Sequence, residues 1–238
     1  MLVNGPLLSA AEDKLPMLMK ENFENGMDRW ETTDPDPAAS VWKIIQPGGP
    51  GNHVLRVTAG STYRPKYRSP YSIALLKDVS VGDFILKARV QSTNTKAGGH
   101  RDLCIFWGYQ DPNHFYYVHL GAKADPHACQ IFIVNDAPRK MITVDQAEGT
   151  PWDDDWHNVK VVRRVADGTM EVYFDDMKKP FMTARDKTFL EGRIGVGTFD
   201  DNGNFDNIVL QGELSKPEQT HRFRVIKRFE SRIDDVGS

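Results

Sequence analysis

Short stretches of alternating hydrophobic and polar residues run through most of the chain. In residues 79–91, Phe84, Leu86, Ala88 and Val90 fall on one side, and polar residues fill much of the other. A period of two places one set of side chains against a core and turns the other set outward, as in a β-strand. The stretches are rich in β-branched and aromatic residues and are bounded by Gly, Pro, Asn or Asp, which is typical of strands and turns. The expected strands are 53–59, 71–77, 79–91, 102–109, 114–120, 128–134, 156–165, 169–175, 178–184, 192–199 and 205–211.

These strands predict a two-sheet sandwich, because helical periodicity is almost absent and only 186–190 suits a short helix. Ala166-Asp167-Gly168 separates two strands and predicts a hairpin turn with positive φ at its glycine. All-β sandwiches of 238 residues are commonly single domains. The expected parts are an extended N-terminal segment (1–20), a sandwich domain (21–212) with a loop at 60–70, and a basic C-terminal tail (213–238).

Charge and composition narrow the range of partners. The formal net charge is −3, whereas nucleic acids and anionic membranes attract strongly basic proteins, so neither is expected as a partner. Membrane insertion is not expected, because no apolar run approaches the roughly 20 residues that span a bilayer. Residues 1–20 lack the pattern of a signal peptide. The basic tail is expected to be solvated, with a polyanion-binding arm as the alternative.

Cys104 and Cys129 are too few for a disulfide framework. If strands 102–109, 115–121 and 128–134 form a meander, the two cysteines flank the middle strand, about 9.6 Å apart. A disulfide needs Cα atoms within about 7 Å of each other. We therefore expect two free, largely buried thiols.

The outward face of 115–121 is the best candidate for a binding surface. Alternation assigns its even-numbered residues to the core and turns Phe115, Tyr117 and His119 outward. Sugars are bound by aromatic faces together with planar polar side chains that pair with hydroxyl groups. A carbohydrate-binding groove is therefore expected here, with an ordinary solvated sheet face as the alternative. The expected lining residues are Arg89, Gln91, His100, Tyr117, His119 and Gln130, with Trp107 as an aromatic neighbour.

Other chemistries find little support in the spacing of residues. Four histidines fall within 100–127, but no His-x-His or Cys-x-x-Cys pair accompanies them, so a transition-metal site is not expected. No serine lies in a Gly-x-Ser-x-Gly elbow. The glycine-rich turn at 48–51 precedes a strand rather than a helix, so it does not predict a phosphate-binding loop.

The order of several motifs resembles a known fold group. The motifs are Tyr109-Gln-Asp-Pro-Asn-His-Phe-Tyr-Tyr-Val-His-Leu120, Trp156-His-Asn-Val-Lys-Val161, Asp167-Gly168, Gly192-Arg-Ile-Gly-Val-Gly197 and Phe205-Asp-Asn207. Over about residues 21–212 they resemble the concanavalin A-like jelly-roll group of lectins and glucanases. Within it, the chain is most similar to the 3-keto-disaccharide hydrolase-like branch (family 16 glycoside hydrolase-like) and its fructan-binding relatives. The resemblance implies an all-β, two-sheet antiparallel jelly-roll sandwich.

The resemblance implies recognition of an oligo- or polysaccharide on the concave face, and it leaves catalysis open. Laminarinase-type members carry a Glu-x-Asp-x-x-Glu strand, and this chain has no such run. In the alternative, a glycoside-processing hydrolase acting on 3-keto-disaccharides, His119 or Asp102 serves as acid or base and Arg101 binds the developing charge. A second alternative is a protein-interaction domain that uses the loop at 63–68 and the basic tail.

Calcium is the cofactor that the resemblance implies. Jelly rolls of this kind often hold a calcium ion near the first and last strands, which makes Glu24 and Asp206 the candidate ligands. Calcium takes six to eight oxygens, so backbone carbonyl groups must complete the shell. The acidic turns at 153–155 and 200–201 are alternatives. The resemblance also implies an extracytoplasmic location.

Overall fold

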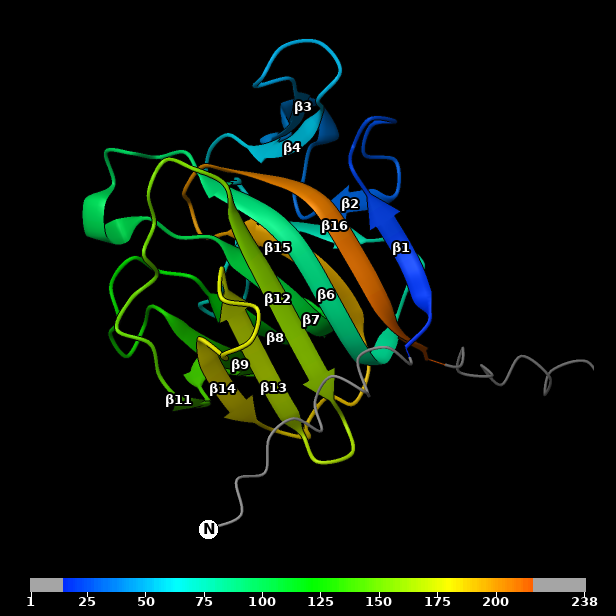
Figure 1. Cartoon of the computed structure of the whole chain (residues 1–238), viewed down its shortest axis with the longest axis vertical. Helices are drawn as coiled ribbons and strands as arrows, with labels where there is room; N and C mark the ends of the chain where they lie inside the picture. The colour runs from blue at the N-terminus through cyan, green and yellow to red at the C-terminus, as the bar shows by residue number, and fades with distance from the viewer. Residues whose placement is uncertain (1–14, 216–238) are drawn as a thin grey trace, which may run out of the picture.

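The computed structural model describes residues 15–215 as a sandwich of two antiparallel sheets, which confirms the expected fold class (Figure 1). One layer, sheet A, has nine strands. Their order is β11 (Thr143–Asp145), β14 (Met182–Arg185), β13 (Thr169–Phe174), β12 (His157–Arg164), β6 (Val81–Ser92), β16 (Gly203–Leu214), β4 (Val54–Val57) and β3 (Trp42–Ile45), with β1 (Met17–Glu21) also paired to β16.

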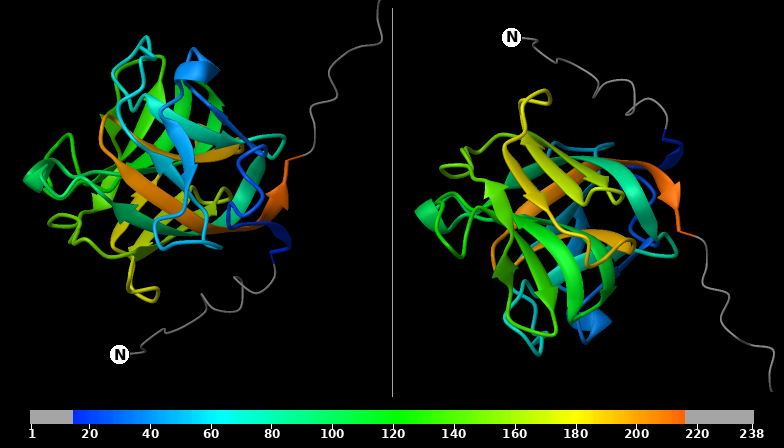
Figure 2. Two further views of the ribbon diagram at one scale, coloured as in Figure 1. Left: turned by 90° about the horizontal axis from the view of Figure 1, so that it is seen from above. Right: turned by 90° about the horizontal axis from the view of Figure 1, so that it is seen from below.

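The other layer, sheet B, has seven strands and lies behind sheet A in Figure 1. Figure 2 shows the two layers from above and below. The strand order of sheet B is β10 (Lys140–Met141), β9 (Gln130–Asn135), β8 (His114–His119), β7 (Cys104–Asp111), β15 (Arg193–Thr198), β5 (Ser72–Leu76) and β2 (Trp30–Thr32).

The main core lies between the sheets and follows the predicted alternation. On β8, Tyr116 and Val118 point into this core, and Leu120 joins them directly after the strand. Leu86 of β6 belongs to the same cluster from the opposite sheet. Each large apolar side chain buried in this way stabilises the fold by about 1.5–3 kcal/mol relative to an exposed one. The hairpin between β12 and β13 is also confirmed, with Gly168 at φ 79°.

A second apolar cluster lies on the outer face of sheet B, and we call it the outer cluster. Its aromatic rings pack in a row, with ring centroids 5.7 Å apart for Phe106 and Tyr117 and 5.1 Å apart for Tyr117 and Phe132. The members are Ile73, Leu75, Cys104, Phe106, Tyr109, Phe115, Tyr117, Phe132 and Val134, and all are buried. Outward-facing side chains of this sheet are therefore largely shielded from solvent.

Residues 60–70, which we call the strap, are anchored at two places on this sheet. At one end, the backbone N–H of Ser61 donates to Oγ of Ser72 on β5 at 2.9 Å. At the other end, the carbonyl oxygen of Arg68 accepts the backbone N–H of Arg139, between β9 and β10, at 3.1 Å. Because β15, β7 and β8 lie between these two anchoring points in the sheet, the strap crosses its outer face.

Several expectations need correction or lie outside the described residues. The helix predicted at 186–190 is wrong: this segment is irregular, because Asp186 Oδ1 accepts the backbone N–H of Thr188 at 2.7 Å and bends the chain locally. In the described part of the chain, β1 begins inside the segment expected to precede the sandwich, and β16 ends at Leu214. Within residues 15–215 no helix has the length and apolar character to cross a membrane. The expectations for residues 1–14 and 216–238 lie outside the described residues.

Both cysteines are free and buried, as expected. Cys104 lies on β7 in the outer cluster, whereas Cys129 lies just before β9 in the main core. Burial raises the pKa of both thiols, and that of Cys104 lies well above its ordinary value. Neither thiol is therefore activated as a nucleophile.

Candidate binding pocket

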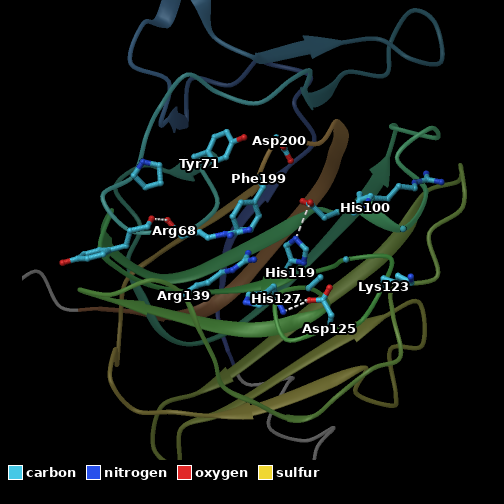
Figure 3. A pocket seen from close by; sticks show the side chains of 18 residues that line it. Arg68, Tyr71, His100, His119, Lys123, Asp125, His127, Arg139, Phe199 and Asp200 are labelled. Atoms are coloured by element: carbon cyan, nitrogen blue, oxygen red, sulfur yellow. Dashed lines mark hydrogen bonds and ion pairs between the residues drawn. The ribbon is translucent and has the colours of Figure 1, made fainter.

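A pocket of about 620 Å³ opens on the outer face of sheet B, beside the strap (Figure 3). Its walls come from segments distant in sequence: the end of the strap with Tyr71, the turn at 99–102, the loop that follows β8, Arg139, and the residues after β15. The structure brings two predicted ligand-binding residues into this lining, His100 at its exposed rim and His119 as a buried residue.

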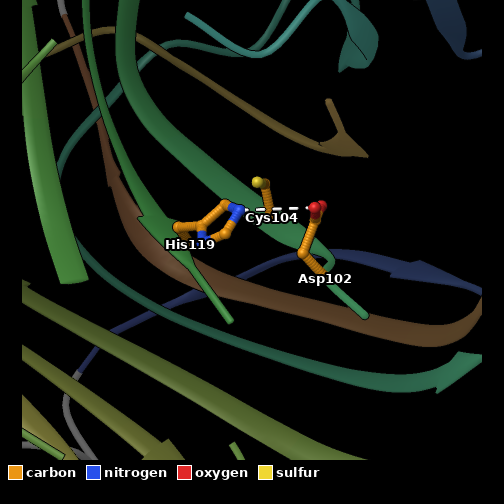
Figure 4. A group of neighbouring side chains, drawn as sticks. All are labelled: Asp102, Cys104 and His119. Carbon is orange, nitrogen blue, oxygen red and sulfur yellow. Dashed lines mark ion pairs between the residues drawn. The ribbon is translucent and has the colours of Figure 1, made fainter. Parts of the chain in front are cut away.

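His119 and Asp102 form a buried pair in the pocket wall (Figure 4). Nε2 of His119 lies 3.4 Å from Oδ2 of Asp102, and Nδ1 accepts the backbone N–H of Cys129 at 3.3 Å. Since Nδ1 accepts a hydrogen bond, the ring proton resides on Nε2 and points to Asp102. Both ring nitrogens are therefore occupied by the protein itself.

Asp102 is equally well bonded. Its Oδ1 accepts the hydroxyl of Thr198 at 2.6 Å. Burial alone would raise the pKa of Asp102, but the hydrogen bonds from His119, from Thr198 and from the backbone of Phe199 hold this pKa below its ordinary value. The side chain is thus an anion that the protein has already solvated.

Asp102, Cys104 and His119 could also hold a metal ion, since one ligand atom of each lies within 4.8 Å of the others. The spacing of residues missed this group because its members come from two neighbouring strands and the turn before one of them. Coordination through Nε2 would place a proton on Nδ1, where the Cys129 N–H already donates. The observed hydrogen bonds therefore suit the metal-free pair.

Arg101 is the residue expected to bind developing charge. It lines the pocket, but its guanidinium group is bonded to other protein groups. Its Nε donates to Oγ of Ser92 at 3.0 Å and its Nη2 donates to the Ser92 carbonyl oxygen at 2.8 Å. Nη1 lies 3.2 Å from Oδ1 of Asp154. The side chain therefore ties the end of β6 to the acidic turn at 153–155, and the structure does not support the predicted catalytic role.

Three predicted residues of the groove are buried and do not line the pocket. Tyr117 faces outward as expected, but it lies in the outer cluster beneath other side chains and has no exposed surface. Gln130 faces the same side and donates through Nε2 to the carbonyl oxygen of Asp125 at 3.2 Å. Trp107 points into the main core and stacks on Tyr116. The structure buries these side chains away from the pocket, because alternation assigns a face and not exposure.

Arg89 and Gln91 lie on the other sheet. Both belong to β6 of sheet A, where the Arg89 guanidinium carbon lies 5.1 Å from the ring centroid of Trp156. Gln91 donates to the Asp154 carbonyl oxygen and accepts from Nδ2 of Asn204. They therefore cannot line one groove with His119, contrary to the prediction from the sequence. The strands β6 and β8, which were expected to be neighbours, belong to different sheets.

Sequence reasoning missed the aromatic wall of the pocket. It consists of Tyr67, Tyr71 and Phe199, which are all half-buried. Tyr71 and Phe199 meet edge to face, with ring centroids 6.3 Å apart. Burial, followed by the charge of Asp200, raises the pKa of Tyr71, so its hydroxyl stays protonated. The concentration of Tyr and Arg in the loop at 60–70 was the available indication of this wall.

Glu24 and Asp206 lie outside the pocket. Glu24 accepts from the backbone N–H of His53 at 2.9 Å and lies 2.6 Å from its Nδ1. Burial raises the pKa of Asp206, against the Asn207 backbone N–H and the charge of Arg89, which lower it; the negative charges of Glu24 and Glu21 add smaller raising effects. Mutual repulsion of these carboxylates is what a bound cation would relieve, and oxygen donors suit calcium.

Comparisons with solved structures agree on the fold. The carbohydrate binding module CBM66 from Bacillus subtilis superposes with a TM-score of 0.56 at 17% identity, covering 78% of this chain and 97% of that one. A Bacillus subtilis protein of unknown function with a galectin-like fold gives 0.51 at 10% identity, covering 85% and 99%. The β-glucanase of Bacillus licheniformis gives 0.49 at 12% identity, covering 82% and 97%.

No protein-family model matches the chain, and no curated protein sequence matches it significantly. The structural neighbours are nonetheless concanavalin A-like jelly rolls, as the sequence motifs indicate. The chain therefore has the concanavalin A-like jelly-roll fold. At these identities the comparisons establish the architecture alone.

Proposed function

We propose that this protein binds a carbohydrate in the pocket on the outer face of sheet B. The observation that carries the proposal is the aromatic wall, because Tyr67, Tyr71 and Phe199 surround polar groups in one pocket of about 620 Å³. Aromatic faces cover the C–H side of a sugar ring while polar side chains pair with its hydroxyl groups. The pocket volume also falls in the range typical of small-ligand sites.

The fold neighbours support the same proposal. One of them is a carbohydrate binding module, and it superposes over 97% of its own length. A jelly roll that presents a lined pocket on one sheet is a sufficient scaffold for a sugar-binding module. We keep an oligo- or polysaccharide as the proposed ligand. The proposed contact surface is now the aromatic wall rather than the residues of β6 and β8.

Binding accounts for the site better than hydrolysis does. An acid or base needs an atom free to exchange a proton with the substrate. Both nitrogens of His119 face protein groups, and the two oxygens of Asp102 are bonded to Thr198 and His119. The glycoside-processing alternative therefore requires these bonds to be broken before reaction.

A glycan panel tests the proposal through binding and product formation together. We expect at least one oligosaccharide to raise the melting temperature and to give a calorimetric isotherm without product, since a ligand of the native state stabilises it. Tyr71→Ala should weaken binding tenfold or more. Trp156→Ala is the matched control, because Trp156 is a half-buried aromatic residue outside the pocket, directly before β12 of sheet A.

The outcomes separate the alternatives. If the unmodified protein forms product from a glycan and His119→Ala does not, the function is hydrolysis rather than binding alone. Glycan affinity that is equal in Tyr71→Ala and in the unmodified chain would remove the pocket from the proposal. A protein-interaction domain would show neither effect, and the strap, in which Thr62, Arg64, Lys66 and Arg68 are exposed, would then be its candidate contact surface.

We further propose that calcium binds at Glu24 and Asp206 as a structural ion. The support is positional: Glu24 follows β1, β1 pairs with β16, and Asp206 lies on β16 two residues from the partner of Glu21. Calcium there would stabilise the region where the segment after β1 lies near β16, without contact with the pocket.

A further inference from the structure

Arg139 is the cation in the pocket whose surroundings are hardest to explain without a ligand. Its guanidinium carbon lies 4.4 Å from the ring centroid of Phe199 and 5.1 Å from that of Phe132. Its Nη1 donates one long hydrogen bond, 3.4 Å, to the hydroxyl of Tyr117. Within residues 15–215 its Nε has no hydrogen-bond partner, and no carboxylate lies within ion-pair distance of the guanidinium.

A half-buried guanidinium without an anionic partner has lost solvation that the protein does not replace. Stacking over Phe199 leaves its in-plane N–H groups directed sideways, and the planar fork of Arg suits the two oxygens of a carboxylate. Figure 3 shows Arg139 beside His119 and Phe199, within the pocket lining.

The other charges of the pocket favour the same kind of ligand. Arg68 and Lys123 are exposed cations in its lining, and neither forms an ion pair within the described residues. Of the three carboxylates in the lining, Asp102 is bonded to His119, and Asp125, which accepts the backbone N–H of His127 at 2.6 Å, remains an exposed anion. Asp200 lies near Tyr71 (Figure 3). The rim cations therefore attract an anionic chain.

We propose that the glycan bound in this pocket is acidic, and that Arg139 binds the carboxylate of a uronic acid unit. This inference rests on the proposed carbohydrate-binding function and adds the ligand class to it. Phe199 orients the guanidinium by stacking against it, and Arg68 and Lys123 assist the approach of the chain without fixing its position.

Matched pairs of oligosaccharides test the inference. The probes are tetramers of galacturonate, glucuronate and mannuronate, each with its carboxyl-reduced neutral form, measured by calorimetry at two salt concentrations beside the neutral glycan panel. We expect at least one acid tetramer to bind tenfold or more tightly than its reduced form. Arg139→Gln should bring this ratio close to one, and Arg139→Lys should restore only part of it.

Arg89→Gln is the control, since it removes an arginine from sheet A and should leave the ratio unchanged. A ratio of acid to neutral affinity is insensitive to general destabilisation, which the melting temperature of each variant reports separately. Equal affinity for acid and reduced forms, or a preference that persists in Arg139→Gln, would overturn the inference. If neutral glycans then still bind and depend on Tyr71, the proposed function stands; if no glycan of either panel binds, both fall.

Discussion

Nε2 of His119 lies 3.4 Å from Oδ2 of Asp102, and both side chains are buried. This contact joins the end of β8 to the residues just before β7, at the edge of the pocket. Burial works against the charge of Asp102, but the bonds from His119 and Thr198 outweigh it and lower the pKa of Asp102. The stability of this corner of the sandwich therefore depends on an ionised, fully bonded carboxylate.

Thr198→Val should weaken the protein and make it more sensitive to acid. The substitution removes the 2.6 Å bond to Asp102, so the free energy of unfolding at neutral pH should fall by about 1–3 kcal/mol. Because the pKa of Asp102 is lower in the folded state, its contribution is present above the unfolded-state pKa and is lost as the pH falls through the folded-state pKa. The variant raises the folded-state pKa, so acid unfolding, followed by tryptophan fluorescence, should begin at higher pH.

The matched control is Thr183→Val, which removes an exposed 2.6 Å bond to Asp145. Its acid transition should stay close to that of the unmodified protein. Equal shifts in the two variants would contradict the special role assigned to Asp102.

Ser72→Ala should loosen the strap. Oγ of Ser72 accepts the Ser61 backbone N–H at 2.9 Å and donates to the Phe199 carbonyl oxygen at 3.2 Å, so one hydroxyl positions both the strap and the aromatic wall. Loss of these bonds should cost about 1–3 kcal/mol and speed hydrogen exchange in residues 60–70. Ser80→Ala, which removes a hydroxyl 3.1 Å from that of Ser215 near the surface, should leave exchange in the strap unchanged.

Gly192→Ala should be among the most destabilising small substitutions. Gly192 has φ +152°, and an added Cβ would lie 2.3 Å from the carbonyl carbon of Gly108. Backbone strain costs about 1–3 kcal/mol, and crowding of the packed strands adds about 1–3 kcal/mol. Gly49→Ala, at φ +95° in open space, should show the strain alone. If Gly192→Ala and Gly49→Ala lower the denaturant midpoint equally, the added Cβ at Gly192 causes no crowding.

Calcium removal should lower the melting temperature if Glu24 and Asp206 hold the ion. We expect EGTA to destabilise the protein, calcium to restore it, and Asp206→Asn to abolish the response. Asp155→Asn, in the alternative acidic turn, should leave the response intact. If EGTA leaves the melting temperature of the unmodified protein, purified with calcium, unchanged, Glu24 and Asp206 do not hold a structural calcium ion.

The fold was largely predictable because the information is local. Alternation in β8 separates Tyr116 and Val118 from Phe115 and Tyr117, and the structure places the two sets in different clusters. The hairpin at Gly168 likewise follows from a turn sequence between two strands. The candidate site was harder to predict, since period two does not reveal that Tyr117 is covered or that Arg101 is bonded to Ser92.

The sequence by itself determined which side chains of each strand turn inward, since this depends only on neighbouring residues along the chain. Tertiary structure alone decided that Arg89 lies on a different sheet from His119, that the strap crosses the outer cluster, and that Arg139 meets Phe199. Those contacts join segments far apart in sequence, and their positions depend on how two sheets pair and stack. The pocket is therefore a property of the folded chain as a whole.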